Sequence, residues 1–187
     1  MPRRRSESAQ LTLGSGEDDG SVFRGLPAEL QTDPTSEGPV LAALELIASG
    51  VPEEEAARSL TWKDFEEFCA QLLRASGYTV RENVYLSHPR AQIDLVASGP
   101  LFVISLDCKH WRRAPSHPAL EGFAVAQLRR SRLLRGTLNN PRPIVSAILS
   151  FSESAGSFVQ GVAVVPMRTL RNFLETVESY SGLLEMS

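Results

Sequence analysis

The pattern of hydrophobic and polar residues along the chain predicts five helices and five strands. The helices are expected over Pro39–Ser49, Pro52–Ser59, Trp62–Ser76, Pro118–Leu134 and Met167–Ser179. The strands are expected over Tyr78–Leu86, Gln92–Ala97, Leu101–Trp111, Ile144–Phe151 and Phe158–Val165. From Trp62 onward the order is helix, three strands, helix, two strands and helix. This order predicts an α/β or α+β fold in which helices flank a central mixed β-sheet.

The second and third predicted strands form a hairpin that places acids where they are costly to bury. Asp107 and Lys109 share one face of the third strand, because strand side chains alternate between faces. An antiparallel register closing near Gly99 sets Asp94 opposite either Ser105 or Asp107. In both registers two carboxylates and one ammonium group lie within about 5 to 8 Å of one another.

The helix before the hairpin is expected to carry one further acid. Thr61 is a favourable N-cap and Gly77 a favourable stop. Helical spacing assigns the core face to Trp62, Phe65, Cys69, Leu72 and Leu73. Glu66 lies one turn from Trp62, at the edge of that face. It is either a glutamate at the solvent rim or a third acid for a metal site.

Three segments are expected. Residues 1–36 contain few bulky apolar side chains and are predicted to form a disordered tail. Its Arg3–Arg5 cluster is interpreted as a solvated basic end, with phosphate contact as the alternative. Residues 37–60 are predicted to form a small helical hairpin. Its second helix is acidic, so packing or partner contact is favoured over reading DNA bases. Residues 61–187 are the expected main domain.

Composition limits the class of protein. The chain has 187 residues, 42% of them hydrophobic, and a formal net charge of -3, as expected of one core-bearing globular domain. No apolar run approaches a membrane span, and the first residues lack a secretory signal, so a cytoplasmic location is expected. The two cysteines, Cys69 and Cys108, are too few for a disulfide framework and are predicted to be buried thiols.

Positive charge is concentrated after the hairpin. Residues 107–142 contain eight basic and two acidic residues, and Lys109 is one of only two lysines beside seventeen arginines. A basic segment that begins at the suspected site favours contact with phosphates, which would weaken with salt. The candidate nucleic-acid contacts are His110, Trp111, Arg112, Arg113, Gln127, Arg129 and Arg130.

The acids and the lysine suggest metal-assisted chemistry. Asp94 and Asp107 repel each other when both are ionised, which favours a divalent cation between them. Oxygen ligands select Mg²⁺ or Mn²⁺, and the backbone carbonyl of Cys108 is a candidate additional ligand. Lys109 would position a water molecule and stabilise a charged phosphorane. The competing interpretation is an exposed Asp107–Lys109 ion pair worth about 0 to 1 kcal/mol.

These residues resemble the PD-(D/E)xK nucleases, particularly the Mrr-like restriction endonuclease and archaeal Holliday-junction resolvase branches. The matching segments, within residues 62–165, are Phe65-Glu66-Glu67-Phe68, Leu72-Leu73, Gly77-Tyr78, Ile93-Asp94-Leu95-Val96 and Asp107-Cys108-Lys109. The resemblance implies an αβββαβ core. It also implies metal at Asp94 and Asp107, Lys109 as the catalytic lysine, Glu66 as the helix acid and a possible further ligand, and Gln127 and Arg130 on the helix facing the substrate.

Two positions depart from the family pattern. Ile93 stands where the family name has proline, and Asp107 stands where many members carry glutamate or glutamine. The shorter carboxylate of Asp107 leaves open whether one or two metals bind.

The expected function is a Mg²⁺-dependent DNA endonuclease in which water attacks a phosphodiester, leaving a 5′-phosphate and a 3′-hydroxyl as the resemblance implies. Cutting both strands would favour a homodimer. The alternatives are a catalytically silent nucleic-acid-binding module of the same fold and a structural partner-binding domain. The sequence leaves open duplex or branched DNA, and DNA or RNA.

Overall fold

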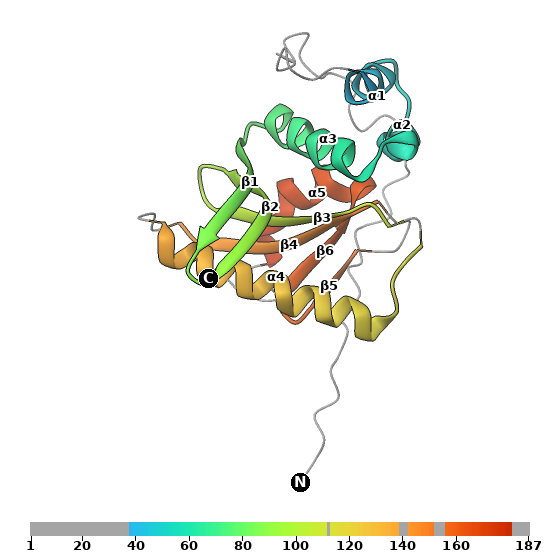
Figure 1. The fold of residues 1–187 in the computed structure, drawn as a ribbon. Helices are drawn as coiled ribbons and strands as arrows, with labels where there is room; N and C mark the ends of the chain where they lie inside the picture. Colours follow the sequence, from blue (N-terminus) through green and yellow to red (C-terminus); the bar gives the residue numbers. More distant parts are fainter. Residues whose placement is uncertain (1–37, 112, 139–141, 152–155, 181–187) are drawn as a thin grey trace.

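The computed structural model describes residues 38–111, 113–138, 142–151 and 156–180 (Figure 1). The predicted tail over residues 1–36, its Arg3–Arg5 cluster and the candidate contact Arg112 lie outside these residues.

A six-stranded mixed sheet forms the centre of the fold. Its strands are β1 (Thr79–Ser87), β2 (Arg90–Ser98), β3 (Val103–Lys109), β4 (Ile144–Ser150), β5 (Ser157–Val159) and β6 (Val162–Pro166), in the order β1-β2-β3-β4-β6-β5. Neighbouring strands are antiparallel from β1 to β3, parallel from β3 through β4 to β6, and antiparallel between β6 and β5. The predicted mixed sheet is confirmed.

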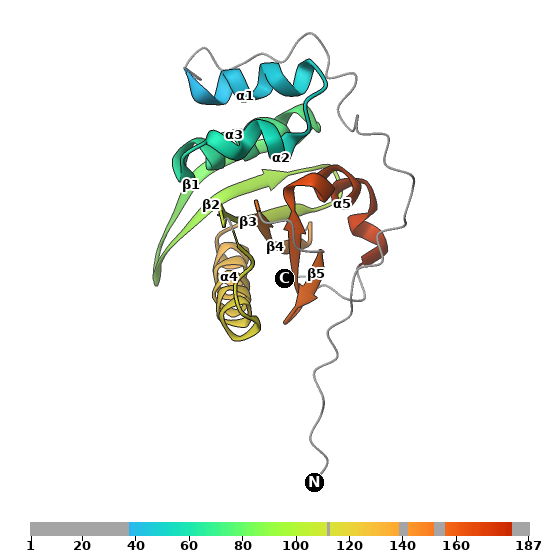
Figure 2. The ribbon, with the colours of Figure 1, turned by 90° about the vertical axis from the view of Figure 1, so that its right-hand side faces the viewer.

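Helices cover both faces of the sheet (Figure 2). They are α1 (Pro39–Ala48), α2 (Glu53–Ala56), α3 (Trp62–Ala75), α4 (His117–Thr137) and α5 (Leu170–Thr176), with short 3₁₀ turns at Ala57–Ser59, Met167–Thr169 and Val177–Tyr180. Helices α3 and α5 lie on one face, with α2 beside α3 and α1 outside it, and α4 lies on the other face. None of the helices described is both long and apolar enough to cross a bilayer.

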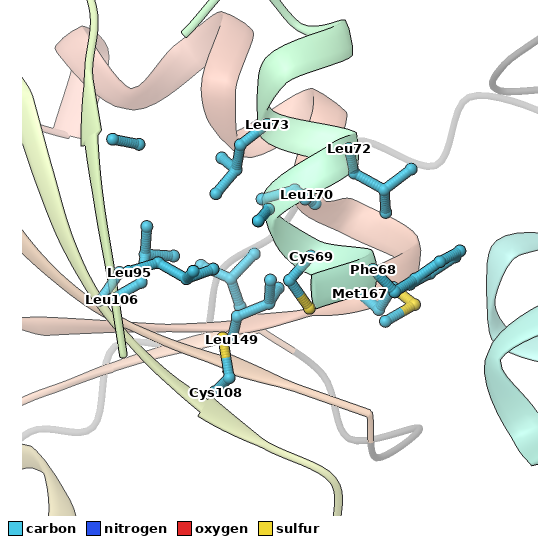
Figure 3. Packing of buried hydrophobic residues seen from close by; sticks show 14 of the residues in the cluster. Phe68, Cys69, Leu72, Leu73, Leu95, Leu106, Cys108, Leu149, Met167 and Leu170 are labelled. Atoms are coloured by element: carbon cyan, nitrogen blue, oxygen red, sulfur yellow. The ribbon is translucent and has the colours of Figure 1, made fainter. Parts of the chain in front are cut away.

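The largest hydrophobic core lies between α3, α5 and the sheet (Figure 3). Cys69 of α3 and Cys108 of β3 are both buried and free, as predicted. A hydrogen bond between the two thiols, together with burial, raises the pKa of Cys108 well above its ordinary value. The thiol therefore stays protonated and acts as a packing group.

The helical hairpin α1–α2 belongs to this same core. Four α1 residues are at most 3% exposed and pack in the cluster that contains the α3 residues, namely Val40, Ala43, Leu44 and Ile47. Helix α1 thus adds an outer layer to the domain and packs on α3 from the side away from the sheet.

Two sequence-based predictions are wrong. Trp62 is 61% exposed, because it lies at the first position of α3, beyond the part of the helix that packs on the sheet. The expected single strand Phe158–Val165 is two antiparallel strands joined at Gln160-Gly161, where both residues have positive φ (53° and 76°). Every side chain of the short β6 strand is buried, so no alternation marked the turn.

The N-terminus of α3 is fixed by a capping box. The Asp64 amide donates to Thr61 Oγ1 (3.3 Å), and the Thr61 amide donates to Asp64 Oδ2 (2.9 Å). Gly77, with φ of 87°, follows the C-terminal end of the helix. Both helix boundaries predicted from the sequence are therefore confirmed to within one residue.

We expect Thr61→Ala to lower the free energy of unfolding by about 1 kcal/mol, because it removes the cap. Thr61→Ser retains a hydroxyl acceptor and serves as the control, with a change under about 0.5 kcal/mol. Urea denaturation followed by circular dichroism measures both. Equal losses in the two variants would show that the cap does not stabilise α3.

Candidate active site

The hairpin β2–β3 brings the two predicted aspartates together. Its register pairs Leu95 with Leu106, which is one of the two registers expected from the turn. Continued by one residue, this register sets Asp94 across from Asp107 on the face covered by α4. The two carboxylates are close enough that the charge of Asp107 raises the pKa of Asp94.

Asp107 is a buried carboxylate held by two cations. It is 4% exposed. Its Oδ2 lies 2.9 Å from Lys109 Nζ, and its Oδ1 lies 3.1 Å from Arg130 Nη1 of α4. Lys109 Nζ also lies 5.6 Å from the centroid of the Phe123 ring. Two positive charges thus compensate the cost of removing this carboxylate from water.

Helix α4 is joined to the site by buried hydrogen bonds. Gln127, which is fully buried, donates from Nε2 to the backbone oxygen of Ser105 (2.8 Å) and to its hydroxyl (3.0 Å). Its Oε1 accepts from Arg130 Nη1 at 3.1 Å. The chain Ser105–Gln127–Arg130–Asp107 therefore fixes the guanidinium and the carboxylate relative to the sheet.

Asp94 is in a less compensated position. Its Oδ2 accepts a hydrogen bond of 2.8 Å from the backbone amide of Cys108. Burial raises the pKa of Asp94, the charge of Asp107 raises it further, and the Cys108 amide opposes the rise. A positive charge added beside this pair would be stabilised by both carboxylates.

Glu66 faces the same charges from α3. Burial raises the pKa of Glu66 to about 7, Asp94 and Asp107 add to the rise, and Lys109 opposes it. The sequence left open whether Glu66 is a glutamate at the solvent rim or an acid of the site. In the structure Glu66 interacts electrostatically with all three charged residues of the hairpin.

One cleft of about 570 Å³ joins these groups. Helix α3 supplies Trp62 and Glu66, β2 supplies Arg90 and Asp94, β3 supplies Asp107 and Lys109, and α4 supplies Arg129 and Arg130. Four basic and three acidic side chains therefore line it. The acids lie at the hairpin and α3, and the arginines lie along α4 and at the start of β2.

Other predicted contacts lie outside this cleft. His110 packs between Phe65 and Phe151, with ring centroids 5.1 and 4.7 Å apart, and Trp111 packs on Phe123 at 5.1 Å. Arg113 is exposed but is not a lining residue, and Gln127 is buried beneath Arg130. Of the predicted nucleic-acid contacts that the structure describes, Arg129 and Arg130 line the cleft.

The donor set fits a hard divalent cation at an incomplete protein site. Among the described residues, no three His, Cys, Asp or Glu side chains converge closely enough to hold a metal by themselves. The pair Asp94 and Asp107 nevertheless supplies oxygen donors in close proximity. Mg²⁺ is commonly bound by one or two carboxylates, with water and substrate phosphate completing its octahedron.

Sequence reasoning missed four residues at or beside the site. Trp62 and Arg90 line the cleft, Ser105 anchors Gln127, and Phe123 lies beside Lys109. The i, i+4 spacing of Trp62 and Glu66 places both on one side of α3 and was the available signal. No local pattern identifies the other three, because their positions depend on how α4 and the hairpin pack.

Residues 57–174 match the model of the restriction endonuclease family Mrr_cat. The chain belongs to this family. The match runs from the turn before α3 to α5 and covers every strand, so it confirms the resemblance and the restriction-endonuclease-like fold. The chain is therefore placed in a nuclease family of the restriction-endonuclease type. Comparison with curated proteins and with solved structures gave no match.

We expect Glu66→Gln to stabilise the protein at pH 8 and to have little effect at pH 4. The folded state holds the Glu66 proton up to about pH 7, whereas the ordinary value is 4.5, so wild-type stability falls as pH rises between them. The glutamine removes this loss. Thermal melts in metal-free buffer measure the difference, and a gap that does not widen from pH 4 to pH 8 would contradict the raised pKa.

Proposed function

We propose that the protein is a divalent-metal-dependent DNA endonuclease that hydrolyses phosphodiester bonds at the Asp94–Asp107–Lys109 site. The observation that carries the proposal is the buried Asp107 carboxylate, held between Lys109 and Arg130 beside a second aspartate in an open cleft. An ordinary surface ion pair stays exposed to solvent, so the burial of Asp107 indicates that this pair is more than a surface contact. The family match supports the nuclease class independently.

In this proposal Asp94 and Asp107 hold Mg²⁺ or Mn²⁺, with the Cys108 backbone carbonyl as an additional ligand and Glu66 as a further candidate. When bound, the ion supplies positive charge against the phosphate oxygens. Lys109 presents its ammonium to the same region, where it orients the attacking water and stabilises negative charge on the phosphorane. The water oxygen bonds to phosphorus and gives up a proton, the P–O3′ bond breaks, and the leaving O3′ takes up a proton, so that a 5′-phosphate and a 3′-hydroxyl result.

The basic side of the cleft is proposed to hold the DNA backbone. Arg129 is exposed, and Arg90 lies at the start of β2 on the same cleft. Arg130 is tied to Asp107 and so contributes charge from a fixed position. A homodimer is proposed for substrates cut on both strands, because each chain carries one such site.

A catalytically silent DNA-binding module is the second candidate. It is favoured by the pairing of both Asp107 carboxylate oxygens with the cations Lys109 and Arg130, which would compete with a metal ion. Such a module would keep the arginine side of the cleft and its salt-dependent binding, and would cut no DNA in Mg²⁺ or Mn²⁺.

We expect Asp107→Asn and Lys109→Met each to lower Mg²⁺- or Mn²⁺-dependent cleavage by about 100-fold or more, because each removes a charge next to the reacting phosphate. A panel of labelled duplex, branched and single-stranded DNA, with RNA for comparison, measures the rates. Circular dichroism melting checks folding.

Arg81→Met is the control, since Arg81 is an exposed cation that does not line the cleft. It should cut at the wild-type rate. Cleavage that survives both site changes would rule out this site. Salt-dependent binding without any cleavage by the wild type would identify the silent module.

We expect Arg129→Ala to weaken DNA binding on all sequences and to reduce the slope of log Kd against log salt by about one unit, because one phosphate contact is lost. Arg58→Ala is the control, as Arg58 is exposed but lies away from the cleft. Fluorescence anisotropy at several salt concentrations measures both slopes. An unchanged slope for Arg129→Ala would place the DNA backbone elsewhere.

A further inference from the structure

Trp62 is an exposed aromatic residue at the rim of the cleft. It is 61% exposed and occupies the first position of α3, one turn before Glu66. Both side chains line the cleft. An indole is among the largest apolar groups a chain can expose, so its position at this rim calls for an explanation.

Packing does not explain the position of Trp62. The indole belongs to none of the three hydrophobic clusters formed by the described residues. The interaction found at its ring is with Lys63 Nζ, 5.5 Å from the centroid. The neighbouring Phe65 is fully buried, so the core contact of this turn is already made without Trp62.

The charges around the indole suit a nucleic-acid strand. Arg90 and Arg129 line the same cleft, and so do Lys109 and Arg130, which are paired with Asp107. A basic groove that follows the backbone, combined with an aromatic side chain on which a base stacks, is the usual design for binding single-stranded nucleic acid. This cleft has both the basic side chains and an exposed indole, and Trp62 lies one helical turn from Glu66 of the candidate site.

A base can stack on Trp62 only if one of its faces is uncovered. In continuous duplex DNA each base is covered by its neighbours above and below, so stacking requires a single-stranded, extruded or terminal nucleotide. We propose that the substrate of this site is DNA with an unpaired nucleotide beside the cleaved phosphate, and that Trp62 recognises its base by stacking. The inference rests on the proposed function and narrows its substrate class.

The test compares two duplexes with identical ends, one continuous and one interrupted by a short single-stranded gap. The full chain is used in EDTA, so that no cleavage occurs, and binding is measured by anisotropy. Trp62→Ala should weaken binding to the gapped DNA by about 10-fold and to the continuous duplex by less than about 2-fold. Trp62→Tyr keeps an aromatic face and should restore most of the affinity.

Tyr85→Ala is the matched control, because Tyr85 is 74% exposed and does not line the cleft. It should bind both duplexes as the wild type does. A 2-aminopurine in the gap gives a second measurement: its fluorescence should be quenched by wild type and not by Trp62→Ala. Circular dichroism confirms that each variant is folded.

Equal losses on the two duplexes, no loss on either, or full rescue by Trp62→Leu would overturn the stacking inference. None of these results would contradict the nuclease proposal. That proposal is refuted if the wild type shows no metal-dependent cleavage. Selective gap binding through Trp62 without cleavage would instead leave the stacking inference intact on a silent module.

Discussion

The charge of Asp107 is the constraint on which the rest of the structure depends. A carboxylate with 4% exposure is tolerated only where other charges replace its lost hydration. Lys109 and Arg130 supply that replacement from β3 and α4. Since Arg130 must reach Asp107, and Gln127 must reach Ser105, α4 is held to β3 at a fixed rotation. Apolar packing alone would leave the rotation of α4 less well defined, because apolar contacts are not directional.

The position of β3 in the sheet explains how the site is supported on both sides. Strand β3 is antiparallel to β2 and parallel to β4, so its backbone is held by both neighbours. Its alternation sends Asp107 toward α4 and Cys108 toward α3, where the thiol packs with Cys69. One strand therefore connects the polar layer under α4 to the largest hydrophobic core. A shift of β3 would disturb both layers, which makes the carboxylate geometry rigid.

The sequence was most informative where a pattern had a single physical cause. Alternation and the turn near Gly99 placed Asp94 beside Asp107, and the Thr61 cap and Gly77 defined α3. Trp62 was misassigned because helical periodicity gives the apolar side of a helix but not the point at which that side leaves the sheet. Gln127 is a related case. A polar residue in an apolar stripe is compatible with substrate contact or buried support, and only its partner Ser105 distinguishes them.

The hairpin α1–α2 supports the site although none of its residues lines the cleft. The family match begins at residue 57, after α2, yet α1 buries Val40 and Leu44 in the core shared with α3. Helix α3 is thereby packed from outside as well as from the sheet side, and it carries Glu66 and Trp62 to the cleft. The raised pKa of Glu66 and the exposure of Trp62 both depend on where α3 lies relative to the hairpin residues. Helices α1 and α2 thus help to set the position of the cleft rim without contributing a residue to it.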